Sequence, residues 1–330
     1  TYGNSANGIE GPSKINVLNV NFLSTLSSNR FNEFHFTYAR ELRPRNAVES
    51  NVPPDTAMGD PAFRFGHPFF LGPNVDETLW RSQIKNNLSI VSGQHTFKVG
   101  GEWLHTVNDQ VFRGFFQGRY LFATVGGFLR YASPAAAGGF GPNAVACSNG
   151  SWVTNPTPCP AGTTLAGTPL LLYIQETGTG FPNVDPAGKS LLINEDLALF
   201  AQDQWRVRPN VTINYGLRWD AQLMADTVDP ATTAYPSFVN NAAFLSDGTI
   251  PNQLKQFQPR FGISWDVKGD SRTVVRANAG LYYARNNMLS QAGSVTANGL
   301  QNQGAVRGAV TGLVPGVVPM PTWPGLVEIP

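Results

Sequence analysis

The sequence predicts an all-β fold, namely part of a transmembrane antiparallel up-and-down β-barrel with about eight strands in four hairpins. Three observations support this prediction. Apolar and polar residues alternate with a period of two in several segments, and short turns alternate strictly with long connections. No apolar run reaches the roughly 18 residues that a transmembrane helix needs, so that class of membrane protein is excluded.

The composition narrows the class of protein further. Charged residues make up only 14% of the 330 residues and aromatic residues 11%, which does not suit a disordered chain. The formal net charge of +1 gives no reason to expect a nucleic-acid partner. The chain opens on Thr1-Tyr2-Gly3-Asn4, without the basic and apolar regions of a signal peptide, and we expect both ends to be cut.

The alternation is clearest in two segments. In 31–40, Phe34, Phe36 and Tyr38 share one face of the predicted strand, and in 211–220 the residues with odd numbers are apolar or aromatic. Successive side chains of a strand point to opposite faces, so each segment has one apolar and one polar face. The predicted strands cover residues about 15–24, 31–40, 79–91, 95–106, 194–206, 211–221, 257–267 and 273–285.

The connections between these strands differ in length. Short turns rich in Gly, Pro, Asn, Asp and Ser lie at 26–30, 92–94, 208–210 and 268–271. The other connections are long, about 41–78, 107–193 and 222–256. An up-and-down chain would place every short turn at one end and every long connection at the other, as membrane barrels do with periplasmic turns and outer loops. We expect 107–193 to be the principal outer loop, with 112–122 extending the barrel above the membrane.

A soluble sandwich with one buried face is the alternative reading of such alternation. Strands of 10 to 13 residues and three long loops in one domain do not favour it. Charged side chains on the polar face would also be costly to bury in a sandwich core. Five tryptophans are predicted near strand ends on the apolar face, where a lipid boundary would favour them: Trp80, Trp103, Trp205, Trp219 and Trp265.

The period of two predicts which side chains face lipid and which face the barrel interior. Asp203 falls on the apolar side, so a bulge or a membrane-interface position is expected there. The predicted lipid-facing residues are Phe36, Tyr215, Leu217, Ile263 and Leu281, and the predicted lumen-facing residues are Thr37, Asn214, Arg218 and Arg276.

One hairpin carries a family resemblance. Residues 199–220 (LFAQDQWRVRPNVTINYGLRWD) resemble a hairpin that recurs in TonB-dependent receptors, and 258–283 looks like the next hairpin of that family. Residues 32–40 and 95–102 resemble earlier hairpins. The best likeness is to the large receptors that carry a carboxypeptidase-regulatory-like domain ahead of the plug.

The resemblance implies a barrel of 22 strands in the bacterial outer membrane. Residues 1–330 would then be a fragment of one β-barrel domain, without the plug domain and the energy-coupling box. The implied partners are outer-membrane lipid, the TonB complex through the missing plug region, and a solute whose identity is unknown. A fragment with two open edges is not expected to insert into a membrane alone.

The sequence shows no pattern of catalytic, cofactor-binding or metal-binding residues, so we expect no enzyme, no cofactor and no metal site. His35, His67, His95 and His105 lack metal-ligand spacing, and His95 and His105 are read as membrane-interface residues. The 188–190 segment lacks the earlier glycine of a phosphate loop, and no nucleophile elbow occurs. Arg218 and Arg276 could contact an anionic solute, but pairing with carboxylates of a plug or a neighbouring strand is the favoured reading.

The two cysteines, Cys147 and Cys159, lie 12 positions apart in the longest connection. A protein that crosses the oxidising periplasm would join them, so a disulfide is predicted. Two free thiols are the alternative, and a metal site is disfavoured because no His or acid lies between them.

These observations together predict energised uptake of a scarce solute through a plugged barrel. The alternative is a surface adhesion or structural barrel without transport, and a soluble carbohydrate-binding sandwich is a third possibility.

Overall fold

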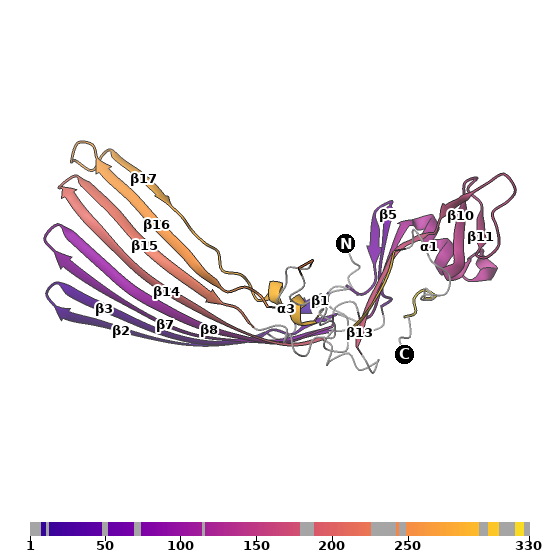
Figure 1. Cartoon of the computed structure of the whole chain (residues 1–330), viewed down its shortest axis with the longest axis horizontal. Helices are drawn as coiled ribbons and strands as arrows, with labels where there is room; N and C mark the ends of the chain where they lie inside the picture. Colours follow the sequence, from indigo (N-terminus) through magenta and orange to yellow (C-terminus); the bar gives the residue numbers. More distant parts are fainter. Residues whose placement is uncertain are drawn as a thin grey trace.

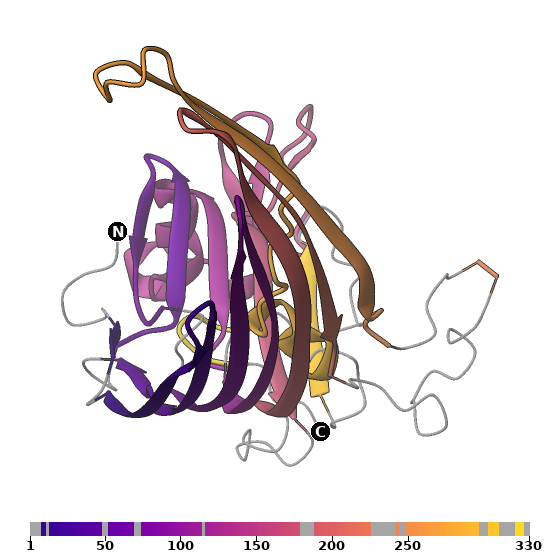
Figure 2. The ribbon, with the colours of Figure 1, turned by 90° about the vertical axis from the view of Figure 1, so that its left-hand side faces the viewer.

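The computed structural model describes residues 8–10, 13–47, 52–68, 74–113, 116–178, 188–225, 242–243, 249–296, 303–309 and 321–326. Within these ranges the chain forms a long curved antiparallel sheet and, beyond one end of it, a smaller sheet with a helix against it (Figure 1, Figure 2). Among the described residues, no helix has the length and apolar character needed to cross a bilayer.

The long sheet is built from eight strands that pair antiparallel in the order β2-β3-β7-β8-β14-β15-β16-β17. The predicted eight-stranded antiparallel sheet is thus confirmed. Two short strands, β1 (Gly8–Glu10) and β4 (Arg45–Ala47), add to the sheet beside β7. The long strands are β2 (Lys14–Ser27), β3 (Arg30–Leu42), β7 (Asn74–Ser92), β8 (His95–Phe112), β14 (Lys189–Arg208), β15 (Val211–Leu223), β16 (Gln253–Asp266) and β17 (Val274–Gly280).

The four hairpin turns lie together at one end of the long sheet, at left in Figure 1. They comprise residues 28–29, 93–94, 209–210 and 267–273. Gly93 has a φ of 58°, which glycine adopts without the clash that a Cβ would cause. The longer connections therefore leave and enter the sheet at its other end, as the alternation of short and long links predicts.

Most long strands exceed their predicted bounds, and three of them extend by five or six residues into the predicted connections. β7 begins at Asn74, β8 extends to Phe112 and β14 begins at Lys189, so the predicted connections 41–78 and 107–193 are shorter than expected. The 222–256 connection also ends early, because β16 begins at Gln253. The prediction followed the apolar alternation, which is lost where Thr78 pairs with Asp109. Ladder hydrogen bonds join backbone groups and continue past that point regardless of side-chain polarity.

β17 is shorter than predicted, because it ends at Gly280 and not near 285. The Leu281 N–H still bonds to the carbonyl of Pro259 at 3.1 Å, but Pro259 has no N–H with which to continue the ladder. The chain then leaves the sheet edge, and Tyr282 places its ring 4.6 Å from the guanidinium carbon of Arg260. A short helix, α3 (Leu289–Thr296), follows.

Parts of the longer connections and of the segment that follows β17 build a second sheet that the sequence did not predict. Its strand order is β18-β13-β9-β5-β6, with β5 and β9 parallel. Residues 112–122 therefore do not extend the barrel: β8 ends at Phe112, and Arg119–Thr124 (β9) belongs to this other sheet. The remaining strands are β5 (Asp55–Asp60), β6 (Phe63–Phe65), β13 (Leu170–Gly178) and β18 (Gln303–Ala309).

Helix α1 (Val125–Ala132) packs on this second sheet, and the Thr124 hydroxyl caps it by accepting a bond from the Gly127 N–H at 2.9 Å. We call residues 52–68, 116–178, 303–309 and 321–326 the loop module. Its core buries Met58, Tyr120, Phe122, Tyr131, Leu170 and Tyr173.

The loop module is held together by contacts between separate stretches of chain. The Tyr120 hydroxyl donates to the Gly325 carbonyl at 2.5 Å, and the Tyr131 hydroxyl donates to the Pro321 carbonyl at 2.7 Å. Burial raises the pKa of both tyrosine hydroxyls, so they remain neutral donors. Fully buried Asp55 forms ion pairs with Arg64 on β6 at 2.6 Å and with Arg119 on β9 at 3.0 Å.

The module also carries a small three-stranded sheet, at right in Figure 1. Strands β11 (Trp152–Thr154) and β12 (Leu165–Gly167) flank β10 (Ala144–Cys147), and two 3-10 turns, Ala135–Ala137 and Gly141–Asn143, precede them. Cys147 and Cys159 are joined in a disulfide with their Cα atoms 5.8 Å apart. The two cysteines thus close a loop within one connection.

Candidate functional site: the polar face of the long sheet

The strand register divides the side chains of the long sheet into two faces. Residues that pair directly across two antiparallel strands project to the same side. Phe36 pairs with Ile84, Tyr215 with Asp203 and Phe261, and Ile213 with Ile263. When these pairs are followed from strand to strand, four predicted lipid-facing residues and five tryptophans share one face. They are Phe36, Tyr215, Leu217, Ile263, Trp80, Trp103, Trp205, Trp219 and Trp265.

The opposite face carries the residues predicted to face the lumen. Thr37 pairs with Gln83, Arg218 with Gln258, and Arg276 with Ser264. The fourth residue of that set, Asn214, lies on the same side, opposite Gly262. Leu281 differs from the other members of its predicted set, because it lies just past the end of β17 and the ladder does not fix its direction. We call these two sides the apolar face and the polar face.

Glu102 on β8 is the centre of an ion-pair network on the polar face. Its carboxylate accepts from Arg285 at 2.9 Å, from Arg218 at 3.4 Å and from the Gln83 amide at 2.8 Å. Arg218 also pairs with Asp220 at 2.7 Å. Arg218 thus pairs with carboxylates, as expected, but these lie on its own strand and two strands away across β14, not on a directly neighbouring strand.

Three further cations of the polar face differ in their partners. Lys98 pairs with Glu33 at 2.8 Å across β7, which lies between their strands. Arg260 has no carboxylate partner in the part of the chain that the structure describes, and it contacts Gln258 at 3.2 Å and the ring of Tyr282. Arg276 likewise has no ion pair within the described ranges. Both can therefore interact with groups that the described residues do not supply.

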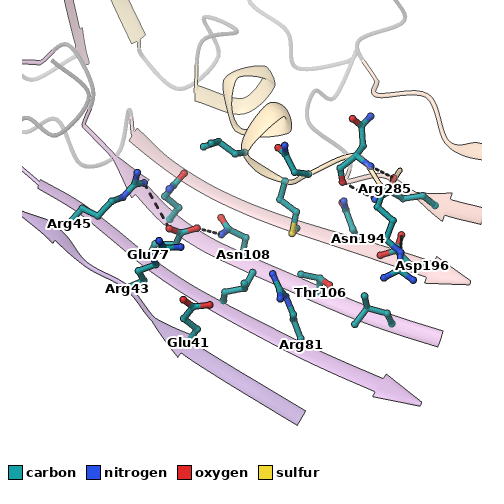
Figure 3. A pocket seen from close by; sticks show the side chains of 18 residues that line it. Glu41, Arg43, Arg45, Glu77, Arg81, Thr106, Asn108, Asn194, Asp196 and Arg285 are labelled. Atoms are coloured by element: carbon teal, nitrogen blue, oxygen red, sulfur yellow. Dashed lines mark hydrogen bonds and ion pairs between the residues drawn. The ribbon is translucent and has the colours of Figure 1, made fainter. Parts of the chain in front are cut away.

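A cavity of about 650 Å³ opens on the polar face near the ends of the strands that lead into the longer connections (Figure 3). The segment from Arg285 to Leu289 covers it on one side. Its charged lining residues are Glu41, Arg43, Arg45, Glu77, Arg81, Asp196 and Arg285, and its polar neutral lining residues include Thr106, Asn108, Gln110, Asn194 and Gln222.

The lining of the cavity mixes paired and unpaired polar groups. Arg45 lies 3.9 Å from Glu77, which accepts a bond from Asn108 at 2.8 Å, and Arg285 lies 3.7 Å from Asp196 (Figure 3). Asn194 is only 2% exposed, and its side-chain Nδ2 has no partner among the described atoms. The cavity thus offers cationic groups, anionic groups and neutral hydrogen-bonding groups. Such a lining suits a polar solute better than an apolar one.

Sequence reasoning did not find this cavity. It named Arg218 and Arg276, neither of which lines it. The alternation with a period of two could have located part of its lining. Every second residue before Gln83, namely Arg81, Leu79 and Glu77, lies on the polar face. The predicted strand began too late to include Glu77, and Arg285 enters only because β17 ends early.

The four histidines have different neighbours. His35 contacts Asn21 at 2.6 Å, while His95 and His105 each contact a carboxylate on the apolar face. His67 lies buried in the loop module, where desolvation lowers its pKa. Among the described residues, no group of three or more His, Cys, Asp or Glu side chains could hold a metal ion.

Comparison with known proteins assigns the chain to a class. Its residues 2–324 match the outer membrane beta barrel domain family. The chain belongs to this family, and it is a protein of the bacterial outer membrane. No curated protein matches it.

Three solved structures resemble the chain over part of their length. The outer membrane transporter YddB from Escherichia coli is 12% identical, with a TM-score of 0.44, over 89% of this chain and 28% of that one. The siderophore receptor PiuA from Acinetobacter baumannii is 12% identical (TM-score 0.32), over 77% of this chain and 30% of that one. The ferric-catecholate import receptor Fiu from E. coli K12 is 11% identical (TM-score 0.31), over 77% and 31%. The chain spans less than a third of the length of these structures.

Proposed function

We propose that this chain is part of a TonB-dependent receptor, which takes up a scarce solute through a plugged barrel of 22 strands. In this proposal the TonB complex supplies the energy through a plug region outside the chain, and the barrel itself catalyses no reaction. The observation that carries the proposal is the polar face, where Glu102, Arg218, Arg285 and Lys98 form ion pairs. Several charged side chains on one face are costly to place in hydrocarbon, whereas a lumen that contains water or a plug accommodates them.

In this proposal one face of the long sheet contacts lipid and the other faces the lumen of the barrel. The apolar face, with Phe36, Tyr215, Leu217 and Ile263, contacts outer-membrane lipid, and Leu281 is proposed to lie on the same side. Thr37, Asn214, Arg218 and Arg276 face the lumen. The cavity beside Arg285 would then lie on the path of the solute, where charged lining side chains such as Glu41 and Arg81 can bind it in passing.

The decisive experiment compares three strains: the parent, a deletion of this gene, and a deletion of the TonB gene. All three grow in a panel of media, each limiting for one scarce nutrient. If the protein is a transporter, both deletion strains should show the same growth defect in one of these media. The reason is that uptake needs both the receptor and its energy source. Normal growth of the gene deletion in every medium, with the TonB deletion impaired in several, would refute energised uptake.

A surface adhesion or structural role is the second candidate, and the loop module favours it. The module has a buried core, an internal ion-pair cluster at Asp55 and a disulfide, so it is a folded surface and not a set of flexible loops. Adhesion predicts that cells lose attachment to a surface or to other cells when the gene is deleted, and that deletion of the TonB gene leaves attachment unchanged.

A further inference from the structure

Two clusters of polar and aromatic side chains interrupt the apolar face of the long sheet. The turn-side cluster surrounds Asp203, which is only 4% exposed. His95 Nδ1 lies 2.6 Å from the Asp203 carboxylate, and the Tyr215 hydroxyl donates to the same oxygen at 2.8 Å. The imidazole of His95 stacks against the rings of Phe97 and Trp205, each with its centroid 5.4 Å away.

The loop-side cluster has the same chemistry further along the same two strands. His105 Nδ1 lies 2.6 Å from one oxygen of Glu195, and the indole N–H of Trp103 donates to the other at 2.8 Å. The rings of Trp103 and His105 stack at 6.0 Å. Each cluster thus combines a carboxylate, an imidazole and an indole on β8 and β14.

On β8 and β14 the side chains of the apolar face between the two clusters are apolar, whereas on β7 the Asn86 amide lies opposite Gly101 and exchanges hydrogen bonds with Asn32. On β14 these apolar side chains are Leu197, Leu199 and Ala201, of which Leu199 is 60% exposed. An unpaired carboxylate in hydrocarbon would be costly, whereas one paired with imidazole and covered by aromatic rings suits the boundary between hydrocarbon and headgroups. The sequence analysis interpreted both histidines as interface residues and expected a bulge or an interface position at Asp203. The ladders on both sides of Asp203 are regular, which favours the interface position.

The spacing of the clusters matches a bilayer. Glu195 and Asp203 are eight positions apart on β14, and His95 and His105 are ten positions apart on β8. At roughly 3.3 Å per residue these intervals span about 26 and 33 Å along the strands. With a strand tilt of about 40°, the corresponding heights are about 20 and 25 Å, against an apolar band of about 25 Å in outer-membrane barrels.

We propose that the two clusters mark the two boundaries of the hydrocarbon layer on this barrel. The turn-side cluster meets phospholipid headgroups on the side of the hairpin turns, and the loop-side cluster meets the leaflet beneath the loop module. Apolar side chains beyond Glu195, such as Leu191 and Ile193, then lie outside the hydrocarbon although they are 55% and 43% exposed. The inference rests on family membership and the register, and it holds whichever solute is transported.

Nitroxide accessibility in the full-length protein, reconstituted in phosphatidylcholine vesicles, tests the boundary. Single cysteines replace Leu191, Ile193, Leu197, Leu199 and Ala201, each labelled without reductant so that the native disulfide stays closed. The ratio of oxygen to nickel-chelate collisions should be highest at Leu199 and severalfold lower at Leu191 and Ile193. Gln202→Cys is the control on the polar face and should show nickel access. A ratio at Ile193 or Leu191 equal to that at Leu199 would overturn the proposal.

A second variant tests the cluster and not only the face. Replacing Glu195 by Leu extends the apolar surface, so the collision ratio at Ile193 should rise toward that at Leu197. The matched change Glu77→Leu lies on the polar face and should leave Ile193 unchanged. An unchanged ratio at Ile193 in Glu195→Leu would contradict the placement of Glu195 at the boundary.

Discussion

Replacing Leu199 by Arg tests the assignment of the apolar face most directly. Leu199 lies four positions from both Glu195 and Asp203, is 60% exposed, and pairs with Gly101 and Trp219. An arginine near the middle of the bilayer should lower the free energy of unfolding by about 2–4 kcal/mol. That loss corresponds to a shift of roughly 30-fold to 1,000-fold in the folding equilibrium at 25 °C.

The magnitude should depend on depth. Leu217 lies only two positions from Tyr215 of the turn-side cluster, so Leu217→Arg should cost less than Leu199→Arg. Gln202→Arg on the polar face is the matched control and should change stability by less than about 1 kcal/mol. Urea titration of the full-length protein in phospholipid vesicles, followed by tryptophan fluorescence, measures all three. A larger loss for Gln202→Arg than for Leu199→Arg would mean that the faces are exchanged.

Three further changes address the loop module and the packing of the sheet. Replacing Cys147 and Cys159 by serine should destabilise the loop module by about 3 kcal/mol, because an open loop has more conformational entropy in the unfolded chain. The expected result is faster proteolysis within 116–178. Reduction of the native protein should raise its intact mass by two hydrogen atoms. Burial holds the pKa of His67 below its ordinary value of 6.5, so the folded module favours the neutral imidazole. The stability of the loop module should therefore fall as pH drops below about 6.5. His67→Gln should weaken this pH dependence in thermal melts at pH 5 and pH 8. A Cβ on Gly100 would lie 2.5 Å from Oδ1 of Asn87 and 2.6 Å from the ring of Phe200, so Gly100→Ala should cost about 1–3 kcal/mol in urea titrations. Adding Asn87→Ala and Phe200→Ala should make the further change Gly100→Ala cost less, and an equal loss with and without these two side chains would contradict the steric reason.

The sequence alone predicted the parts of this protein that depend on local pattern. Alternation with a period of two gave the eight strands and their two faces, because the backbone geometry of a strand sends consecutive side chains to opposite sides. Turn chemistry separated short links from long ones, and the position of Cys147 and Cys159 in one connection indicated their pairing. The same pattern marked Asp203 as a misfit on the apolar face, although it could not name His95 and Tyr215 as its partners.

Tertiary structure decided everything that depends on residues far apart in the chain. The core of the loop module combines Met58, Tyr120 and Tyr173 with the partly buried ring of Trp323, and no short-range period connects them. The ion pair between Glu102 and Arg285 depends on where β17 leaves the sheet, since that exit brings Arg285 to the polar face. Such contacts become visible only once the register between strands is fixed, because register determines which of many polar side chains share a face and lie within hydrogen-bonding distance.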